Sequence, residues 1–247
     1  MKILALETSA KAVSAAVSED GKILCSGFQD TGLTHSRTLM PIVEGILKNT
    51  NLTLQDMDAV AVAIGPGSFT GIRIGVAAAK GLCFAAEKSA IGVSTLSAMA
   101  RNVAFCDGLI VCAMDARRAQ VYNALFEAKD GQLTRLTEDR AISLADLAQE
   151  LRDDPRPKTV VGDGGKLCWT YLTENGVPCR LAPPQLIMQN AMSVALRQSR
   201  WQRKESFSAP RHWSLFTSAR PTRIYPTEKS KTHFHIFKDT KESEHER

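Results

Sequence analysis

The order in which strand-like and helix-like segments follow one another constrains the fold of this chain more than any other feature. Three short strand-like segments come first, at 2–7, 12–18 and 23–28. Helical apolar spacing and then a nearly unbroken apolar strand, of the kind buried in parallel sheets, follow at 35–49 and 58–64. After a glycine-rich loop the pattern predicts a helix, a short strand and another helix, at 71–86, 90–93 and 95–104.

A second series of segments begins near residue 107 and repeats much of this order. We expect its strands at 109–114, 120–127, 132–137 and 158–162, and its helices at 143–152 and 165–174. The order βββαβαβα is that of a half-domain in the actin, Hsp70 and sugar-kinase superfold. We therefore predict an α/β protein of two actin-like (ASKHA or ribonuclease-H-like) lobes, each a mixed sheet with helices. The first lobe would span 1–105, and a second, incomplete lobe would span 106–196.

The composition favours a protein of the cytoplasm. Of the 247 residues, 44% are hydrophobic, which suffices for a sizeable core. No apolar run reaches the roughly 20 residues that cross a bilayer, and Met1–Glu7 carries charge too early for a signal peptide. The six cysteines include no CxxC pair, which favours free thiols in a reducing compartment. These features predict a cytoplasmic location and no membrane partner.

The positive net charge comes from the end of the chain. Residues 197–247 hold twelve Lys or Arg and six Asp or Glu, whereas 1–196 hold 19 basic and 20 acidic residues. Four of the five histidines also lie in 197–247. An interaction with nucleic acid argued from net charge would therefore rest on this basic tail alone.

A glycine-rich loop at Gly65–Gly71 joins the buried strand to the following helix. Such a loop can direct backbone N–H groups, among them those of Gly67 and Ser68, toward an anion at the helix N-terminus. It lacks the GK[ST] ending of a phosphate-binding P-loop. The alternative is a tight turn whose glycines permit close packing, and the sequence leaves both interpretations open.

Three carboxylates lie at expected strand ends: Glu7, Asp115 and Asp163. In a two-lobed ATPase these ends face the cleft and hold a metal–phosphate group. The first turn here, Glu7–Ala10, lacks the Asp-x-Gly that lets the backbone wrap a phosphate, so a capping role for Glu7 is the competing hypothesis. The turn around Asp163 could line a nucleotide or reverse the chain. We treat all three as possible nucleotide-facing residues.

Neither metal nor nucleophile chemistry is supported by the residue types present. Residues 1–196 contain a single histidine, His35, and a zinc site needs several His or Cys ligands at suitable spacing. There is no GxSxG motif for a serine nucleophile. We therefore expect no catalytic residue and no metal ligand in this chain.

Five motifs, taken together, resemble one family. Gly65–Gly75, with the sequence GPGSFTGIRIG, is similar to the signature of the bacterial TsaB (YeaZ-like) family of tRNA threonylcarbamoyladenosine biosynthesis proteins. The other matches, in order, are Leu6–Ser9, Thr34–Ser36, Met114–Arg118 and Val160–Gly164. The resemblance covers about 1–196, and Gln120 stands where the family often has an acid.

The resemblance implies a role in making N6-threonylcarbamoyladenosine next to the anticodon of tRNAs that read ANN codons. It implies a non-catalytic scaffold or activator that pairs with a catalytic paralogue, TsaD, and an ATPase, TsaE. ATP and a divalent metal would then belong to the partner subunits, and no cofactor is expected on this chain. Contact with tRNA would occur through the complex, and a homodimer would form when the partners are missing.

Two apolar stripes on each of two predicted helices suggest a partner surface. A helix that packs on one sheet needs a single apolar face, so a second stripe can be covered by another molecule. The resemblance favours this interpretation, because family members dimerise through these helices; cover by the second lobe is the alternative. The expected partner-binding residues are Leu39, Met40, Val43, Leu47, Gly71, Ile72, Gly75, Val76, Ala78, Ala79 and Leu82.

Three other functions compete with this one. An independent ATP-dependent phosphotransferase would suit the fold but lacks the first phosphate turn. A metalloprotease lacks ligands, and a direct tRNA-binding module would rely on the basic tail. Fold alone does not decide between them.

We predict that 197–247 is translated in a shifted frame and is a disordered or non-native tail. The composition changes abruptly after Leu196, and one choice of codons for 197–221, read from its third base, encodes a helix-like segment followed by Tyr-Leu-Arg-Pro. Loss of the closing elements of a lobe would expose apolar surface and favour aggregation or proteolysis. Sequencing the gene tests the prediction, since a gene without an open alternative frame at this point contradicts it.

Overall fold

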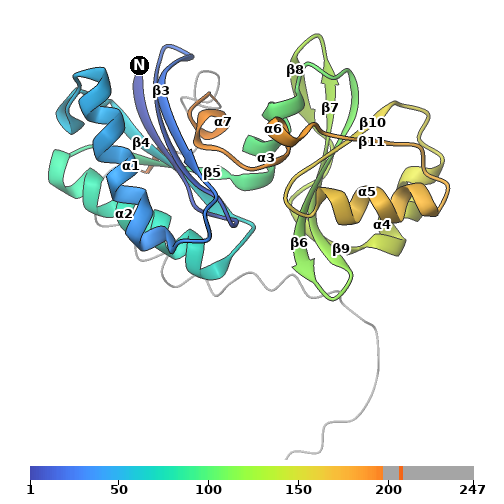
Figure 1. The fold of residues 1–247 in the computed structure, drawn as a ribbon. Helices are drawn as coiled ribbons and strands as arrows, with labels where there is room; N and C mark the ends of the chain where they lie inside the picture. Colours follow the sequence, from blue (N-terminus) through green and yellow to red (C-terminus); the bar gives the residue numbers. More distant parts are fainter. Residues whose placement is uncertain (197–205, 208–247) are drawn as a thin grey trace, which may run out of the picture.

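The computed structural model describes residues 1–196 together with 206 and 207, and it contains two mixed β-sheets with helices packed against them (Figure 1). The predicted fold class, two actin-like lobes, is confirmed. The predicted frame shift and disorder of the tail fall outside the described residues, apart from 206 and 207, and remain predictions.

The first sheet has the strand order β12-β5-β4-β1-β2-β3. Strands β1, β2 and β3 form an antiparallel meander, while β4 and β5 run parallel to β1. The bounds are β1 (Lys2–Glu7), β2 (Val13–Glu19), β3 (Lys22–Gln29), β4 (Ala59–Gly65), β5 (Ser89–Ser94) and β12 (Ser206–Phe207). Helices α1 (His35–Thr50) and α2 (Phe69–Ala86) and the 3-10 turn η1 (Leu54–Asp56) connect them.

Both faces of the first sheet are covered. Helices α1 and α2 bury one face with Leu39, Val43 and Ala79, and the short helix α7 (Ala191–Leu196) buries the other with Val194. Double burial explains why β1, β2 and β4 are almost continuously apolar, because neither side of these strands faces water. Helix α7 follows the second sheet in sequence but packs on the first, which explains how the end of the described chain closes the first lobe.

The second sheet has the order β11-β10-β6-β7-β8, with β9 also paired to β7. Helices α4 and α5 pack on one face, and α3 and the 3-10 turn η2 pack on the face toward the first lobe. The remaining bounds are α3 (Thr95–Ala100), η2 (Arg101–Val103), β6 (Gly108–Arg117), β7 (Gln120–Lys129), β8 (Gln132–Arg135), β9 (Arg140–Ser143), α4 (Leu144–Arg152), β10 (Lys158–Val161), α5 (Gly165–Glu174), β11 (Arg180–Leu181) and α6 (Pro184–Ile187).

The predicted strands and helices of the first lobe agree with the structure to within one to four residues at their ends. The helix expected at 95–104 ends at Ala100 and continues as the 3-10 turn η2, and the helix expected from 71 begins at Phe69. The sequence did not predict β9, β11, α6 or α7, because elements of two to six residues carry too little periodicity to be recognised. The proposed domain boundaries at 105 and 196 remain predictions.

Helix α2 lies so close to β1 that two of its positions have no space for a side chain. A Cβ at Gly71 would collide with the carbonyl oxygen of Thr8, and one at Gly75 would collide with the hydroxyl oxygen of Thr8. Within the described residues, α2 is also the one helix long and apolar enough, by length and composition, to cross a bilayer. One side of it packs on the first lobe through Gly71, Gly75 and Ala79, and the rest of its surface is exposed or partly exposed.

We predict that Gly71→Ala lowers the free energy of unfolding by about 1–3 kcal/mol, because the added methyl group overpacks the contact with Thr8. Gly81→Ala is the matched control on the same helix, since Gly81 is exposed and a Cβ there meets nothing within 4 Å. This control should raise the free energy of unfolding by up to about 1 kcal/mol through helix propensity. Urea denaturation measures both, and equal effects of the two changes would contradict the close-packing argument.

Candidate functional site

Glu7 ends β1 near Asp163 of the second lobe, and we call this place between the lobes the floor. Its carboxyl is 1% exposed; Oε1 accepts a hydrogen bond of 2.6 Å from the Ser9 backbone N–H, and Oε2 has no partner. Burial raises the pKa of Glu7 to about 7, partly offset by Ser9, and the negative charge of Asp163 raises it further. A carboxyl with this pKa can gain or lose a proton near neutral pH.

Asp163 approaches the same floor from the second lobe, just after β10. Its Oδ1 accepts a 3.0 Å hydrogen bond from the side-chain amide of Gln189, and burial raises its pKa. Gln189 is 2% exposed and belongs to the segment that returns to the first lobe. Two residues on, the Ala191 N–H donates to Ser14 Oγ over 2.9 Å, and Ser14 is the strand partner of Glu7. These contacts bring the predicted residues Glu7 and Asp163 to one floor.

Asp115, the third predicted carboxylate, is exposed at the end of β6. Its Oδ1 accepts a 2.8 Å hydrogen bond from the Arg117 backbone N–H. The turn before α5 packs closely here, because a Cβ on Gly164 would lie 2.6 Å from the Asp115 nitrogen. Asp115 therefore lies beside the turn that carries Asp163 but, unlike Glu7, its side chain is exposed.

The Gly65–Gly71 loop packs against the first turn of the protein. The Ser68 N–H donates to the Ser9 carbonyl over 2.7 Å, and the Thr8 hydroxyl donates to the Gly71 carbonyl over 2.8 Å. Ser68 also caps α2 by accepting from the Gly71 N–H at 3.2 Å. Gly67 has φ +152° and lies against Ser9, with no room for a Cβ. These contacts favour the tight-turn interpretation of the loop.

Among the residues that the structure describes, His35 does not lie in a cluster of possible metal ligands. The Nε2 atom of His35 lies 2.7 Å from the Ala10 carbonyl, so its ring contacts the first turn rather than an acid. Among residues 1–196, no three His, Cys, Asp or Glu side chains gather closely enough to hold a metal ion.

The chain passes between the lobes twice, and the side chain of one asparagine hydrogen-bonds the first of these segments to the second. The Asn102 side-chain amide donates to the carbonyls of Leu186 and Met188, over 2.9 and 2.8 Å. Its Oδ1 accepts from Asn190 at 3.0 Å and from the Ser193 hydroxyl at 2.6 Å. Four hydrogen bonds on one buried side chain fix the first crossing against the second.

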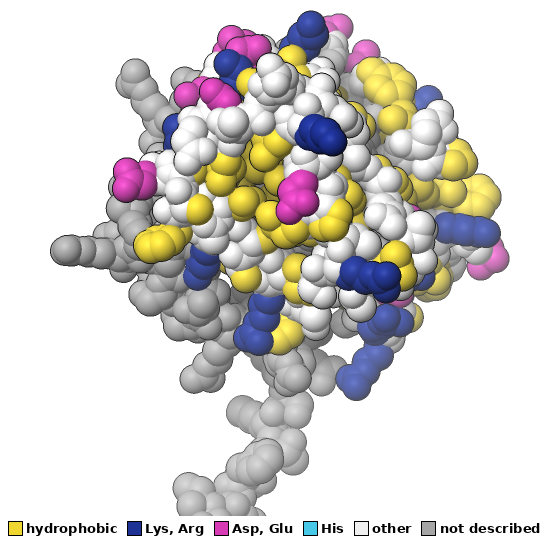
Figure 2. All heavy atoms as spheres, turned by 60° about the vertical axis from the view of Figure 1, so that its left-hand side comes forward, with side chains coloured by type: hydrophobic (Ala, Val, Ile, Leu, Met, Phe, Trp, Pro, Cys, Tyr) yellow, Lys and Arg dark blue, Asp and Glu magenta, His cyan; other side chains and the backbone are white. Residues whose placement is uncertain are grey.

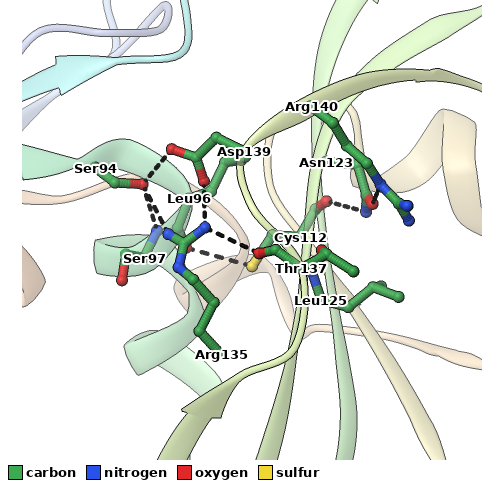
Figure 3. A network of polar contacts seen from close by, with 10 residues as sticks. All are labelled: Ser94, Leu96, Ser97, Cys112, Asn123, Leu125, Arg135, Thr137, Asp139 and Arg140. Carbon is green, nitrogen blue, oxygen red and sulfur yellow. Dashed lines mark hydrogen bonds and ion pairs between the residues drawn. The ribbon is translucent and has the colours of Figure 1, made fainter.

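A second polar cluster joins the two lobes at the start of α3 (Figure 3). Arg135 of β8 lies between Asp139 and Ser94, donating to the Asp139 carboxylate at 2.7 Å and to Ser94 Oγ at 3.2 Å. Ser94 belongs to β5 of the first lobe, and its hydroxyl donates to Asp139 over 2.7 Å. The same oxygen accepts from the Ser97 N–H and caps α3. This hydroxyl therefore uses all of its hydrogen-bonding capacity across the lobe boundary.

The predicted partner-binding residues divide into two groups. One group is buried within the first lobe and contacts its own sheet: Leu39, Val43, Gly71, Gly75 and Ala79. The other group is partly exposed along the two helices, and we name it the α1–α2 face: Met40, Leu47, Ile72, Val76, Ala78 and Leu82. Four of these, Leu47, Val76, Ala78 and Leu82, also pack against the core cluster of the first lobe, whereas Met40 and Ile72 do not. Hydrophobic side chains spread broadly over this side of the molecule, with scattered charged groups (Figure 2).

Exposed aromatic side chains extend the apolar character of α2. Phe84 is 77% exposed and Phe69 is 48% exposed, with the Arg73 guanidinium 3.8 Å from the Phe69 ring centroid. An apolar helix surface of this kind commonly marks a protein–protein contact. Phe69 and Phe84 were not among the predicted partner-binding residues, although their spacing on the helix is visible in the sequence.

Gln189, Asn102 and the Ser94–Arg135–Asp139 cluster were not predicted. Gln189 contacts Asp163 26 residues away, and the contacts of Asn102 and Ser94 reach residues more than 40 positions away, so local sequence patterns contain no signal for them. The one available sign was the polar pair Gln189–Asn190 immediately before the apolar segment of α7.

Several proteins of known family are similar to this chain. The tRNA threonylcarbamoyladenosine biosynthesis protein TsaB of Bacillus subtilis (strain 168) is 36% identical over 162 residues, which cover 66% of this chain and 71% of that protein. TsaB of Escherichia coli (strain K12) is 33% identical over 183 residues, covering 73% and 79%. A solved structure, YeaZ from Pseudomonas aeruginosa, matches with TM-score 0.72 and 27% identity over 84% of this chain and 95% of that one.

Proteins described as tRNA N6-adenosine threonylcarbamoyltransferases also match, over a shorter length. The family model described as TsaD, tRNA N6-adenosine threonylcarbamoyltransferase, matches residues 29–174. The tRNA N6-adenosine threonylcarbamoyltransferase of Brachyspira hyodysenteriae is 31% identical over 114 residues, 40% of this chain and 34% of that protein. The TsaB proteins of B. subtilis and E. coli match over much more of both chains, so similarity to TsaB describes the chain better.

We predict that Glu7 makes stability depend on pH. The pKa of Glu7 is about 7 in the folded protein and near 4.5 in the unfolded chain. Between pH 4.5 and pH 7 the folded protein therefore keeps a proton that the unfolded chain has lost. Stability from this group is therefore present below pH 4.5 and is lost as pH rises to about 7, by on the order of 3 kcal/mol. Glu7→Gln removes this titration. Unfolding of both proteins at pH 5 and pH 8 measures it, and parallel pH profiles would contradict the assignment.

Proposed function

This chain belongs to the TsaB (YeaZ-like) family of tRNA threonylcarbamoyladenosine biosynthesis proteins, and from this premise we propose that it is a non-catalytic scaffold and activator in that pathway. In the proposal it pairs with a TsaD-type threonylcarbamoyltransferase and works with the ATPase TsaE. tRNA would be reached through the complex, and a homodimer would form without the partners. The cytoplasm is the proposed location.

The partly exposed apolar residues of the α1–α2 face are the main support for pairing with a TsaD-type subunit. Two of these residues, Met40 and Ile72, lie outside the buried cluster between helices and sheet, so they are available to another molecule. Phe69 and Phe84 add exposed aromatic area on the same helix. Burying such side chains against a partner stabilises a complex through the hydrophobic effect, at roughly 25 cal/mol for each Å² of apolar surface.

The packing of the first turn supports a non-catalytic role. A phosphate held by the first turn of an actin-like lobe would need the space around Thr8 and Ser9, and both residues are buried beneath the Gly65–Gly71 loop and the start of α2. The same packing argues against an independent phosphotransferase. ATP and a divalent metal would then be bound by the partner subunits rather than by this chain.

We predict that Met40→Arg abolishes co-purification with the TsaD-type subunit, because a charge buried in an apolar contact costs several kcal/mol. Leu167→Arg is the matched control, an apolar-to-Arg change at an exposed position of α5 in the second lobe. Ile72→Arg repeats the test at a second position. The measurement is capture of tagged protein, with light scattering for the complex and circular dichroism for folding.

Two results would contradict the proposal. One is unchanged capture by a folded Met40→Arg and a folded Ile72→Arg variant. The other is formation of threonylcarbamoyladenosine in tRNA by this chain alone, free of its proposed partners.

A further inference from the structure

The tip of the β6–β7 hairpin has an unusual backbone. Three successive residues other than glycine, Arg117, Arg118 and Ala119, have positive φ values of 69°, 53° and 56°. Left-handed backbone is unfavourable for residues with a Cβ and persists where the surrounding structure holds it. The strand register also shifts between Asp115 and Arg117, which is a bulge of the kind that redirects side chains.

The surrounding structure holds this tip from both sides. Asp115 Oδ1 accepts from the Arg117 N–H at 2.8 Å, and Arg117 pairs with Gln120 across the hairpin. On the other side, the Leu144 N–H at the start of α4 donates to the Ala119 carbonyl over 3.2 Å. The two arginines are therefore presented on a fixed backbone, which lowers the entropic cost of binding a ligand.

The positive charges at this tip are not used inside the described chain. Arg117 and Arg118 are exposed, and neither forms an ion pair within residues 1–196. The negative charge of the Asp115 carboxylate would repel an anion bound here. One of its oxygens accepts a hydrogen bond from the Arg117 N–H.

We propose that Arg117 and Arg118 form a phosphate-binding tip that contacts the sugar–phosphate backbone of the tRNA substrate. The planar guanidinium group donates paired hydrogen bonds to phosphate oxygens, and two adjacent arginines suit the repeated phosphates of RNA. The inference rests on the proposed function for the identity of the RNA. Because residues 1–196 carry one more acidic than basic group, the tip is a local contact and not part of a broad basic surface.

The test measures the binding of an unmodified tRNA transcript by the complex with the TsaD-type subunit, and by this chain alone, at several salt concentrations. Arg117→Ala/Arg118→Ala removes both charges, and alanine meets the same left-handed backbone cost as arginine. Removing one charged group from a phosphate lowers the slope of log affinity against log salt by about 0.7 to 0.9. For two such groups we expect a slope smaller by about 1.4 to 1.8, and binding weaker by on the order of tens of fold at about 0.1 M salt.

The matched control is Lys22→Ala/Lys129→Ala, which removes two exposed positive charges: Lys22 begins β3 of the first lobe, and Lys129 ends β7, at the end of that strand opposite the tip. Unchanged affinity and slope in the arginine variant would overturn the proposal, as would an equal loss in the control. A second arm titrates ATP without RNA. Loss of ATP binding in the arginine variant with tRNA binding intact would assign the tip to nucleotide phosphates and overturn the RNA contact.

Failure here is distinguishable from failure of the proposed function. If the arginine variant still co-purifies with the TsaD-type subunit but binds tRNA like the unaltered chain, only the phosphate-binding tip is refuted. If the unaltered chain does not assemble with that subunit, the proposed pairing fails. The tip is then judged by the tRNA titration of this chain alone, in which equal affinity and slope of the two proteins refute it.

Discussion

The close packing of α2 on the turn that follows β1 is the contact on which much of the first lobe depends. Glycine at 71 and 75 lets the helix backbone approach Thr8 more closely than any side chain would allow. That approach places the Ser68 cap over Ser9 and seals the turn from solvent. The same contact buries one side of α2 and leaves Ile72 partly exposed on another. A single close helix–strand approach therefore fills the phosphate turn and also orients the apolar surface that we propose for a partner.

Polar contacts, rather than an apolar interface alone, fix how the two lobes meet. Asn102 satisfies four partners at the chain crossings, and Ser94 satisfies three groups at the second cluster (Figure 3). Hydrogen bonds between partly buried groups of this kind favour one geometry, because another arrangement would leave polar groups shielded from water without partners. At the floor, by contrast, Glu7 and Gln189 each retain an oxygen without a partner. The raised pKa of Glu7 is the electrostatic consequence of its burial with this incomplete pairing.

The sequence predicted the first lobe better than the surfaces that it presents. Periodicity identifies α1 and α2 as helices with wide apolar faces, but it does not tell which stripe meets the sheet. The small residues Gly71 and Gly75 were expected to admit a partner helix, and in the structure they lie against Thr8, the residue that follows β1. Ala78 and Leu82, from the same predicted stripe, are partly exposed. A rotation of a few tens of degrees about a helix axis separates these two outcomes, and sequence spacing does not resolve it.

The sequence by itself determined the class of fold, the order of the strands and helices and the family, because these depend on local periodicity and on ordered motifs such as Gly65–Gly75. It also placed Glu7 and Asp163 at strand ends, where the topology of an α/β fold brings side chains together. Only the tertiary structure decided that Gln189 holds Asp163 at this floor, that α7 returns to the first sheet, and that Arg117 and Arg118 project from a left-handed tip. Those features arise from contacts between distant segments and from backbone dihedral angles, and neither leaves a periodic trace in the sequence.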